Sequence, residues 1–234
     1  MKKIIVVLIV SILMIACSSE KDGNMVVEGT IKGLKKGTLY LQKMNDTAII
    51  SIDSVNVLGD GNFRLTDNVE SPVMYYLTYD GNANDKRILF FGGKGNITIN
   101  DNMSTFGFSP EITGSPNQLV LDKFLKINNQ FKNQRLEFIK KEFDARQSKN
   151  TDLIENLEED YNRMIRRKYL YTTNFALSNS NSEAAAYIAL TELYDANIKL
   201  LDTINKKLSM EVKNSIYGKR LDKYISKIKS KENK

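Results

Sequence analysis

The first half of the chain alternates short apolar runs with turn residues. Between residues 25 and 113, seven segments rich in β-branched, aromatic or other apolar residues are separated by Gly, Asn and Asp. Runs of this length and spacing are typical of strands in an antiparallel sandwich or barrel. The predicted strands are residues 26–31, 38–41, 48–57, 63–65, 73–79, 88–91 and 97–99. We therefore expect an N-terminal antiparallel β-sandwich over residues 25–113.

The pattern becomes helical after Gly114. Ser115 and Pro116 predict a helix start, because Ser caps the first turn and Pro fits the first helical position. Two apolar stripes with helical spacing follow, and their members are Val120, Phe124, Ile127, Phe131 and Phe138, then Leu153, Leu157, Tyr161, Met164, Tyr171 and Phe175. Two helices of about 30 residues joined by a polar turn at residues 148–152 predict a long antiparallel hairpin.

Shorter helices are predicted to complete the chain. A third helix begins after Ser182, and Ser209 and Gly218 are expected to separate the helices beyond it. The predicted fold class is α+β: a sandwich, then an all-helical half over residues 115–229 and a basic tail over residues 230–234. The aromatic stripe of the hairpin must be covered by the later helices, by the sandwich or by a partner.

The N-terminus has the pattern of an export signal. A basic start, Met1-Lys2-Lys3, is followed by an apolar run over residues 4–15. That run is too short for a helix that spans a bilayer, which needs about 20 residues. Ala16 then precedes Cys17, the only cysteine of the chain. A small residue before a cysteine at the end of such a run resembles a bacterial lipobox.

We therefore expect residues 1–16 to be a signal peptide, Cys17 to carry diacylglyceryl and fatty acid chains such as palmitate, and residues 17–24 to be a tether. Two or three chains make such an anchor effectively permanent, whereas one chain binds marginally. The protein would then lie in the cell envelope, on the outer or inner membrane, facing the periplasm or the cell surface. The alternative is an ordinary signal peptide whose cysteine is incidental.

Composition excludes several kinds of chemistry. The chain has no histidine, and its one cysteine is consumed by lipid. This removes Ser-His and Cys-His nucleophiles, histidine metal ligands and disulfides. We predict no catalytic residue, no metal site and no cofactor. The formal net charge of +6 is mild, and nucleic acid is not an expected partner. The excess of lysine after residue 218 predicts a solvated helix face, with a contact to anionic lipid or an acidic partner as the alternative.

Four local motifs have a structural interpretation that we prefer. Asp80–Asn84 begins like a calcium loop but lacks the later Gly and Glu, so a hairpin turn is expected. Gly92–Gly95 resembles a phosphate loop but leads into a strand, which favours a tight turn. The acidic residues Glu155 and Glu158–Asp160 are expected to pair with nearby basic residues. Tyr75, Tyr76 and Tyr79 are expected to pack in a core, with a ligand platform as the alternative.

A series of weak motifs resembles one family. They are Gly29–Ile31, Gly37–Leu41, Ile52–Val55, Gly61–Phe63, Gly95–Ile99 and Gly114–Asn117. In this order they resemble the Bacteroidetes β-domain known as DUF4369, and the segments Ser182–Tyr187 and Val212–Lys219 resemble the helical segment that follows it. The resemblance implies the front part of a membrane-anchored thioredoxin-like thiol-disulfide oxidoreductase. The chain has no C-x-x-C motif, so the redox activity does not carry over.

Two functions are consistent with these features. The first is a non-catalytic binding or interaction module of the envelope, with a thioredoxin-like protein as a candidate partner. The alternative is a glycan-active enzyme that uses carboxylates alone, or a ligand-binding envelope protein. The enzyme needs two carboxylates roughly 5–10 Å apart in one concave site. Asp53, Asp60, Asp67 and Glu70 are candidates by residue type only.

Overall fold

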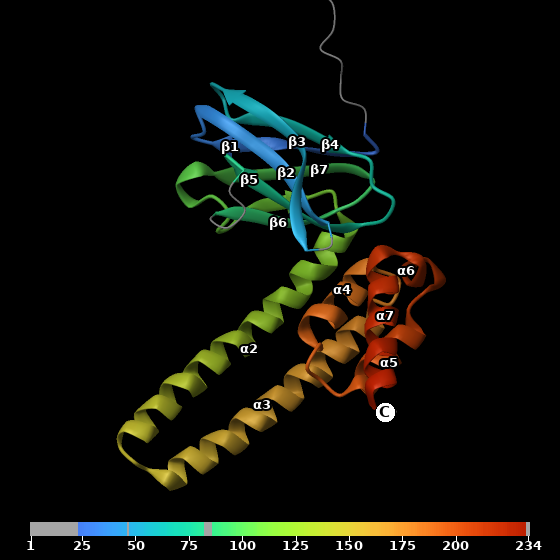
Figure 1. Cartoon of the computed structure of the whole chain (residues 1–234). Coiled ribbons are helices and arrows are strands. Elements are labelled where there is room, and N and C mark those ends of the chain that lie inside the picture. The colour runs from blue at the N-terminus through green and yellow to red at the C-terminus, as the bar shows by residue number, and fades with distance from the viewer. Residues whose placement is uncertain (1–22, 46, 82–85, 233–234) are drawn as a thin grey trace, which may run out of the picture.

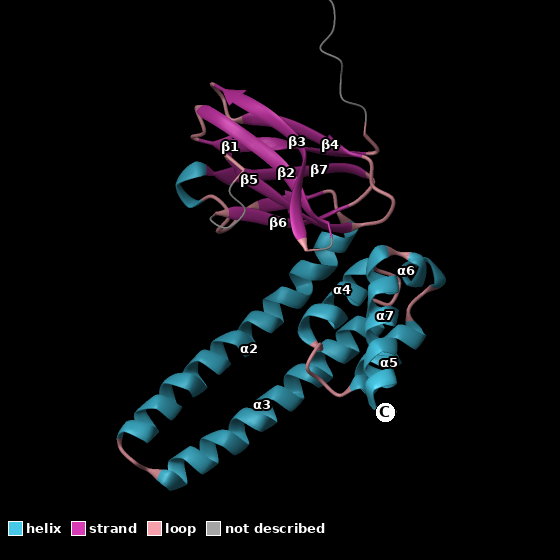
Figure 2. Cartoon of the chain, in the orientation of Figure 1, coloured by secondary structure: helices cyan, strands magenta, loops and turns pink. Residues whose placement is uncertain are grey.

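The structure is a computed structural model that describes residues 23–45, 47–81 and 86–232. A β-sandwich forms one part, and a group of helices with a projecting hairpin forms the other (Figure 1). Figure 2 shows that strands and long helices occupy separate parts, which confirms the predicted α+β order. Within the described ranges, no helix is long and apolar enough to cross a membrane. The predicted signal peptide and Cys17 lie outside these ranges.

Two four-stranded sheets form the sandwich. The first sheet has the order β4 (Asn62–Asp67), β1 (Met25–Lys32), β7 (Gly95–Asn102) and β8 (Glu111–Thr113). The second has the order β3 (Ala48–Leu58), β2 (Lys36–Asn45), β5 (Val73–Tyr79) and β6 (Arg87–Gly92). The predicted sandwich is confirmed, and its strand pairs are antiparallel except for β1 with β7. Strand β7 returns to the first sheet after β5 and β6 of the second sheet and lies on the opposite side of β1 from β4.

The two faces of strand β5 pack into two different hydrophobic cores. Tyr75 and Leu77 are fully buried inside the sandwich, where side chains alternate with a period of two. Met74 points the other way, into a second buried cluster formed mainly by helices. Strand β6 repeats this division, with Phe90 in the sandwich core and Phe91 in the helical cluster. The edge of the second sheet is therefore covered on both faces.

The helical half begins at the predicted residue. Helix α2 (Pro116–Gln147) is capped by Ser115, whose side chain accepts a hydrogen bond from the backbone of Gln118. Helix α3 (Thr151–Ser178) returns beside it, which confirms the predicted hairpin. The remaining helices are α4 (Glu183–Glu192), α5 (Ile198–Lys207), α6 (Met210–Asn214) and α7 (Ile216–Glu232). Helix α7 includes the first three residues of the predicted tail.

Gly218 does not separate two helices, which corrects the prediction. It lies in the first turn of α7, and the break falls at Ser215. A Cβ atom on Gly218 would lie 1.9 Å from the carbonyl oxygen of Val212. A glycine is required there because α6 and α7 approach each other closely. The sequence pattern alone does not distinguish such a glycine from one that ends a helix.

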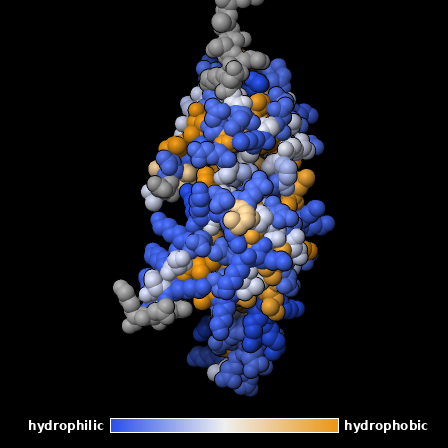
Figure 3. All heavy atoms as spheres, turned by 90° about the vertical axis from the view of Figure 1, so that its right-hand side faces the viewer, coloured by the Kyte–Doolittle hydropathy of each residue, from blue (hydrophilic) through white to orange (hydrophobic). Residues whose placement is uncertain are grey.

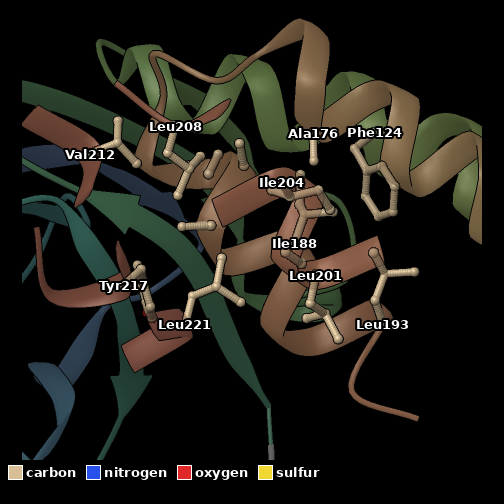
Figure 4. Close-up of a cluster of buried hydrophobic side chains, with 14 of the residues drawn as sticks. Phe124, Ala176, Ile188, Leu193, Leu201, Ile204, Leu208, Val212, Tyr217 and Leu221 are labelled. Atoms are coloured by element: carbon tan, nitrogen blue, oxygen red, sulfur yellow. The ribbon is translucent and has the colours of Figure 1, made fainter. Parts of the chain in front are cut away.

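One buried cluster joins the two halves. It contains Met74 and Phe91 from the sandwich and residues of α2, α3, α4, α5, α6 and α7. Figure 4 shows its helical part, with Ile188 of α4 and Leu201 and Ile204 of α5 pointing toward one another. The face of the molecule seen in Figure 3 is mostly hydrophilic, with apolar residues in small groups. The halves are thus packed together through a common core.

The aromatic stripe of the hairpin is covered within the chain. Phe124 is fully buried and lies 5.8 Å from the Tyr171 ring and 5.3 Å from the Phe175 ring, between centroids. Further out, Phe138 packs edge-on against Tyr161. The predicted stripe therefore packs between the two helices and against the later ones, and its members are not left as an exposed patch.

Candidate binding cleft at the junction of the two halves

The outer face of strand β5 forms one wall of a cleft. Tyr76 follows buried Tyr75 and therefore points out of the sandwich toward the helices. Met44 of β2 and Leu89 of β6 lie on the same wall, and both are partly exposed. Three tyrosines had core packing and a ligand platform as alternatives. Tyr75 packs in the core against Phe90 and borders the cleft, Tyr76 lines the cleft, and Tyr79 packs against the sandwich core.

Helices α4 and α7 supply the opposite wall through Tyr187 and Tyr217. Their ring centroids are 5.1 Å apart, and each ring packs edge-on against Phe91. The hydroxyl of Tyr217 accepts a hydrogen bond of 3.1 Å from the backbone N–H of Met74. The backbone N–H of Ile216 donates to Ser71 Oγ at 3.2 Å. These contacts fix the helical wall to the sandwich wall, so the cleft is preformed.

The cleft has a volume of about 570 Å³, within the range of small-molecule and peptide pockets. Arg220 of α7 lies at its edge, with the guanidinium carbon 5.9 Å from the centre of the Tyr217 ring. Lys43 also lines the cleft but is held by Asp67, with 2.6 Å between Nζ and Oδ2. Arg220 is therefore the cation with the greater freedom to meet a ligand.

Burial raises the pKa of both tyrosines of the helical wall. It raises the pKa of Tyr217 to about 12 and raises the pKa of Tyr187 above its ordinary value. Burial, together with the hydrogen bond that the Tyr75 hydroxyl donates to Asp67 at 2.5 Å, raises the pKa of Tyr75 as well. These hydroxyls are hydrogen-bonding groups at neutral pH and do not act as bases. The cleft is suited to binding by ring contacts and hydrogen bonds.

A second cavity of about 740 Å³ lies on the other side of the contact between Ser71 and α7. Its lining is more polar and includes the starts of α2 and α4. There, Asn117 donates a hydrogen bond of 2.9 Å to buried Glu183 and accepts one from the backbone N–H of Ala184. This network fixes α4 against α2. Glu70 and Ser71 line both cavities.

The four candidate carboxylates do not gather in one site. Asp53 accepts backbone hydrogen bonds from Ser54 and Thr66. Asp60 accepts two hydrogen bonds from Asn62, and Asp67 is bound by Lys43 and Tyr75. Glu70 is the member that lines the two cavities. In the part of the chain that the structure describes, no group of three or more acidic, histidine or cysteine residues could hold a metal ion.

The other motifs have the expected structural roles where they are described. Gly92–Gly95 is the tight turn between β6 and β7. The predicted pairing of the acidic residues on α3 is confirmed in part. Glu159 and Asp160 pair with Arg163, whereas Glu155 and Glu158 form no salt bridge within the described residues. The segment that resembles a calcium loop continues into residues 82–85, which lie outside the described ranges. Cys17, the predicted lipidation site, also lies outside them.

Comparison with known families gives one match, which covers the sandwich and the first residues of α2. The model of DUF4369, a domain of unknown function, matches residues 25–121. Residues 25–121 form a DUF4369 domain. No curated protein and no solved structure matches the chain. The DUF4369 domain therefore contributes Tyr76 to the cleft, whereas Tyr187 and Tyr217 come from the helices that follow it.

The helical wall was not predicted as part of a site. Tyr187 of α4 and Tyr217 of α7 lie beyond the residues 25–121 that match the family model. Their sequence separation from Tyr76 is more than 100 residues. Only the packing of α4 and α7 on the second sheet brings these rings together.

Proposed function

We propose that the protein is a lipid-anchored lipoprotein of the cell envelope that acts as a non-catalytic binding module. The observation that carries this proposal is the tyrosine-lined cleft between the DUF4369 domain and the helices. Tyrosine offers a large rigid contact surface and a hydrogen-bonding group at a low entropic cost, and it is enriched in recognition surfaces. Because both walls belong to one buried core, little order has to be gained on binding.

A thioredoxin-like protein is the candidate partner. The resemblance implies that the sandwich and helical segment accompany a thioredoxin-like domain, and no C-x-x-C motif occurs within residues 1–234. A rigid cleft on a lipid anchor is suited to hold a partner or its substrate at the membrane. The partner would then supply the reactive thiols in trans.

The start of the described chain supports a defined position of the cleft relative to the anchor. Val69 N–H donates to Asn24 Oδ1 at 2.8 Å, and Asn24 Nδ2 donates to the Val69 carbonyl at 3.0 Å. Asn24 thereby fixes the chain on a loop whose residues Asn68 and Val69 line the cleft. From Cys17 to Asn24 the chain spans at most roughly 25 Å. A lipid on Cys17 would therefore hold the cleft close to the membrane surface.

Replacing Cys17 by Ser is expected to abolish lipidation, because the acceptor thiol is lost. Cells that express the wild-type protein should incorporate a labelled fatty acid into it, and the Cys17→Ser variant should show background labelling. The variant should also leave the membrane fraction or accumulate as uncleaved precursor. Fatty acid label retained by the Ser variant would contradict the proposed anchor.

A charged substitution in the wall of the cleft is expected to weaken binding of the partner without unfolding the protein. Leu89→Arg places a charged side chain in the cleft at a residue that is 41% exposed, so the core is not disturbed. The matched control is Leu58→Arg, at a residue that is 73% exposed and lies outside the lining of both cavities. Affinity isolation from native membranes should recover a thioredoxin-like protein with the control and about tenfold less with Leu89→Arg, a loss of about 1.4 kcal/mol. Equal recovery would contradict a role for the cleft.

A further inference from the structure

The outer half of helix α2 exposes an apolar stripe that faces away from its packing partner. Leu136, Ile139 and Phe143 are 64%, 52% and 66% exposed, respectively. Their spacing of three and four residues places them on one side of the helix. They are distinct from Phe131 and Phe138, which pack against α3. In Figure 1 this part of the hairpin projects beyond the other helices.

Unpaired positive charges flank the stripe. Lys132, Arg135 and Lys140 are exposed, and none of their side chains has a hydrogen bond or salt bridge within the described part of the chain. Glu142, on the same part of α2, is bound by Arg146 at 2.6 Å. Asp144, four residues after Lys140, is also exposed, so the three cations leave a net positive charge beside the stripe.

A small cavity continues the stripe toward α4. It has a volume of about 310 Å³, and Phe131, Lys132 and Arg135 form its α2 side. The rest of its lining includes tyrosines from α3 and from the segment after α4, together with apolar and charged residues. The two carboxylates that line it already have partners. Glu192 is bound by Lys168 at 2.8 Å, and Asp195 accepts a hydrogen bond of 2.9 Å from the hydroxyl of Tyr169. The cavity thus offers aromatic walls and two free cations.

We propose that this surface, formed by Leu136, Ile139, Phe143 and the adjoining cavity, binds an acidic amphipathic helix of another protein. A straight apolar stripe on one helix is complementary to the apolar face of a second helix. Acidic residues beside the partner's apolar face would pair with Lys132, Arg135 and Lys140. An apolar or aromatic side chain of the partner would occupy the cavity. This surface lies on the hairpin and is independent of the junction cleft.

Two other occupants fit less well. A bilayer surface is flat and would leave the cavity unfilled, although it could accept the apolar stripe and the cations. A second copy that packed through the same stripe would oppose the same three cations across a symmetric interface. The stripe is also small compared with a standard interface of about 1,600 Å², which favours a transient complex.

Photo-crosslinking in cells of the source organism tests the proposal with the full-length lipoprotein. A benzophenone amino acid replaces Ile139, and in the control it replaces Glu137, which lies roughly 160° around the helix. Cross-linked peptides are identified by mass spectrometry. The Ile139 position should give adducts with a segment that has helical apolar spacing and a net negative charge, at a yield several-fold above that of the Glu137 position.

Reversing the charge of cations beside the stripe distinguishes specific docking of an acidic helix from non-specific apolar contact. Arg135→Glu with Lys140→Glu should reduce the adduct at least about tenfold, or by about 1.4 kcal/mol. The matched control, Lys141→Glu with Arg166→Glu, makes the same change of net charge away from the stripe and should leave the yield unchanged. All four residues are exposed, so folding is expected to be preserved. Adducts with phospholipid, with a second copy or with a segment that is not acidic would overturn the proposal. Adducts insensitive to the reversal, or none above the Glu137 position, would overturn it too.

Discussion

Phe91→Ala will lower the free energy of unfolding by about 3–5 kcal/mol, the usual cost of removing a buried phenylalanine. Phe91 is fully buried on the outer face of β6, where Tyr187 and Tyr217 both pack against its ring. Its loss leaves a cavity bordered by the sandwich and by two helices. Because the cleft tyrosines are positioned by this ring, the variant should also lose binding at the junction cleft.

Urea unfolding followed by circular dichroism and by tyrosine fluorescence measures this effect. Phe108→Ala is the matched control, because Phe108 is 86% exposed and its replacement should change stability by less than about 0.5 kcal/mol. The buried cluster that joins the halves also predicts one cooperative transition for strands and helices in the wild type. If the helices unfolded separately from the strands, or if both variants had equal stability, the common core would not have the role assigned to it.

The elements of the fold could be predicted because local pattern determines them. The change of period at Gly114–Pro116 marks the boundary between strands and helices, and Ser115 is the cap that its type and position predict. The long hairpin follows from apolar spacing and the polar turn near Asn150, which caps α3. These features depend on residues within a few positions of one another, so the sequence alone contains them.

The tertiary relations could not be predicted in the same way. The parallel pairing of β1 with β7 depends on how the chain crosses between sheets, which periodicity does not encode. Glycine is a common residue at helix ends, but the role of Gly218 is to let α6 and α7 approach each other closely. Likewise, the cleft joins Tyr76 to Tyr187 and Tyr217 through packing between distant segments. Core packing was the preferred prediction for Tyr76, and no role was predicted for Tyr187 and Tyr217, because only tertiary packing decides which rings face a cavity.

Gly114, at the connection between the sandwich and α2, is the site of the second large predicted effect on stability. Gly114 follows β8 and precedes the cap of α2, with φ at +89°. A Cβ atom at this position would lie 2.1 Å from the carbonyl oxygen of Asn96 in β7. Only glycine allows both the left-handed backbone and this close approach. The direction in which α2 leaves the sandwich therefore depends on a residue without a side chain.

Gly114→Ala is expected to lower the free energy of unfolding by at least about 3 kcal/mol, combining backbone strain of about 1–2 kcal/mol with the displacement of β8 from β7. Gly95→Ala is the matched control, because Gly95 has φ at +109° but its added Cβ would meet no atom within 4 Å. The control should show the strain alone, about 1–2 kcal/mol. The difference between the two variants in urea unfolding isolates the close approach to Asn96. If both variants lost the same free energy of unfolding, the close approach of Gly114 to Asn96 would not contribute to stability. Gly114 would then not fix the direction of the hairpin.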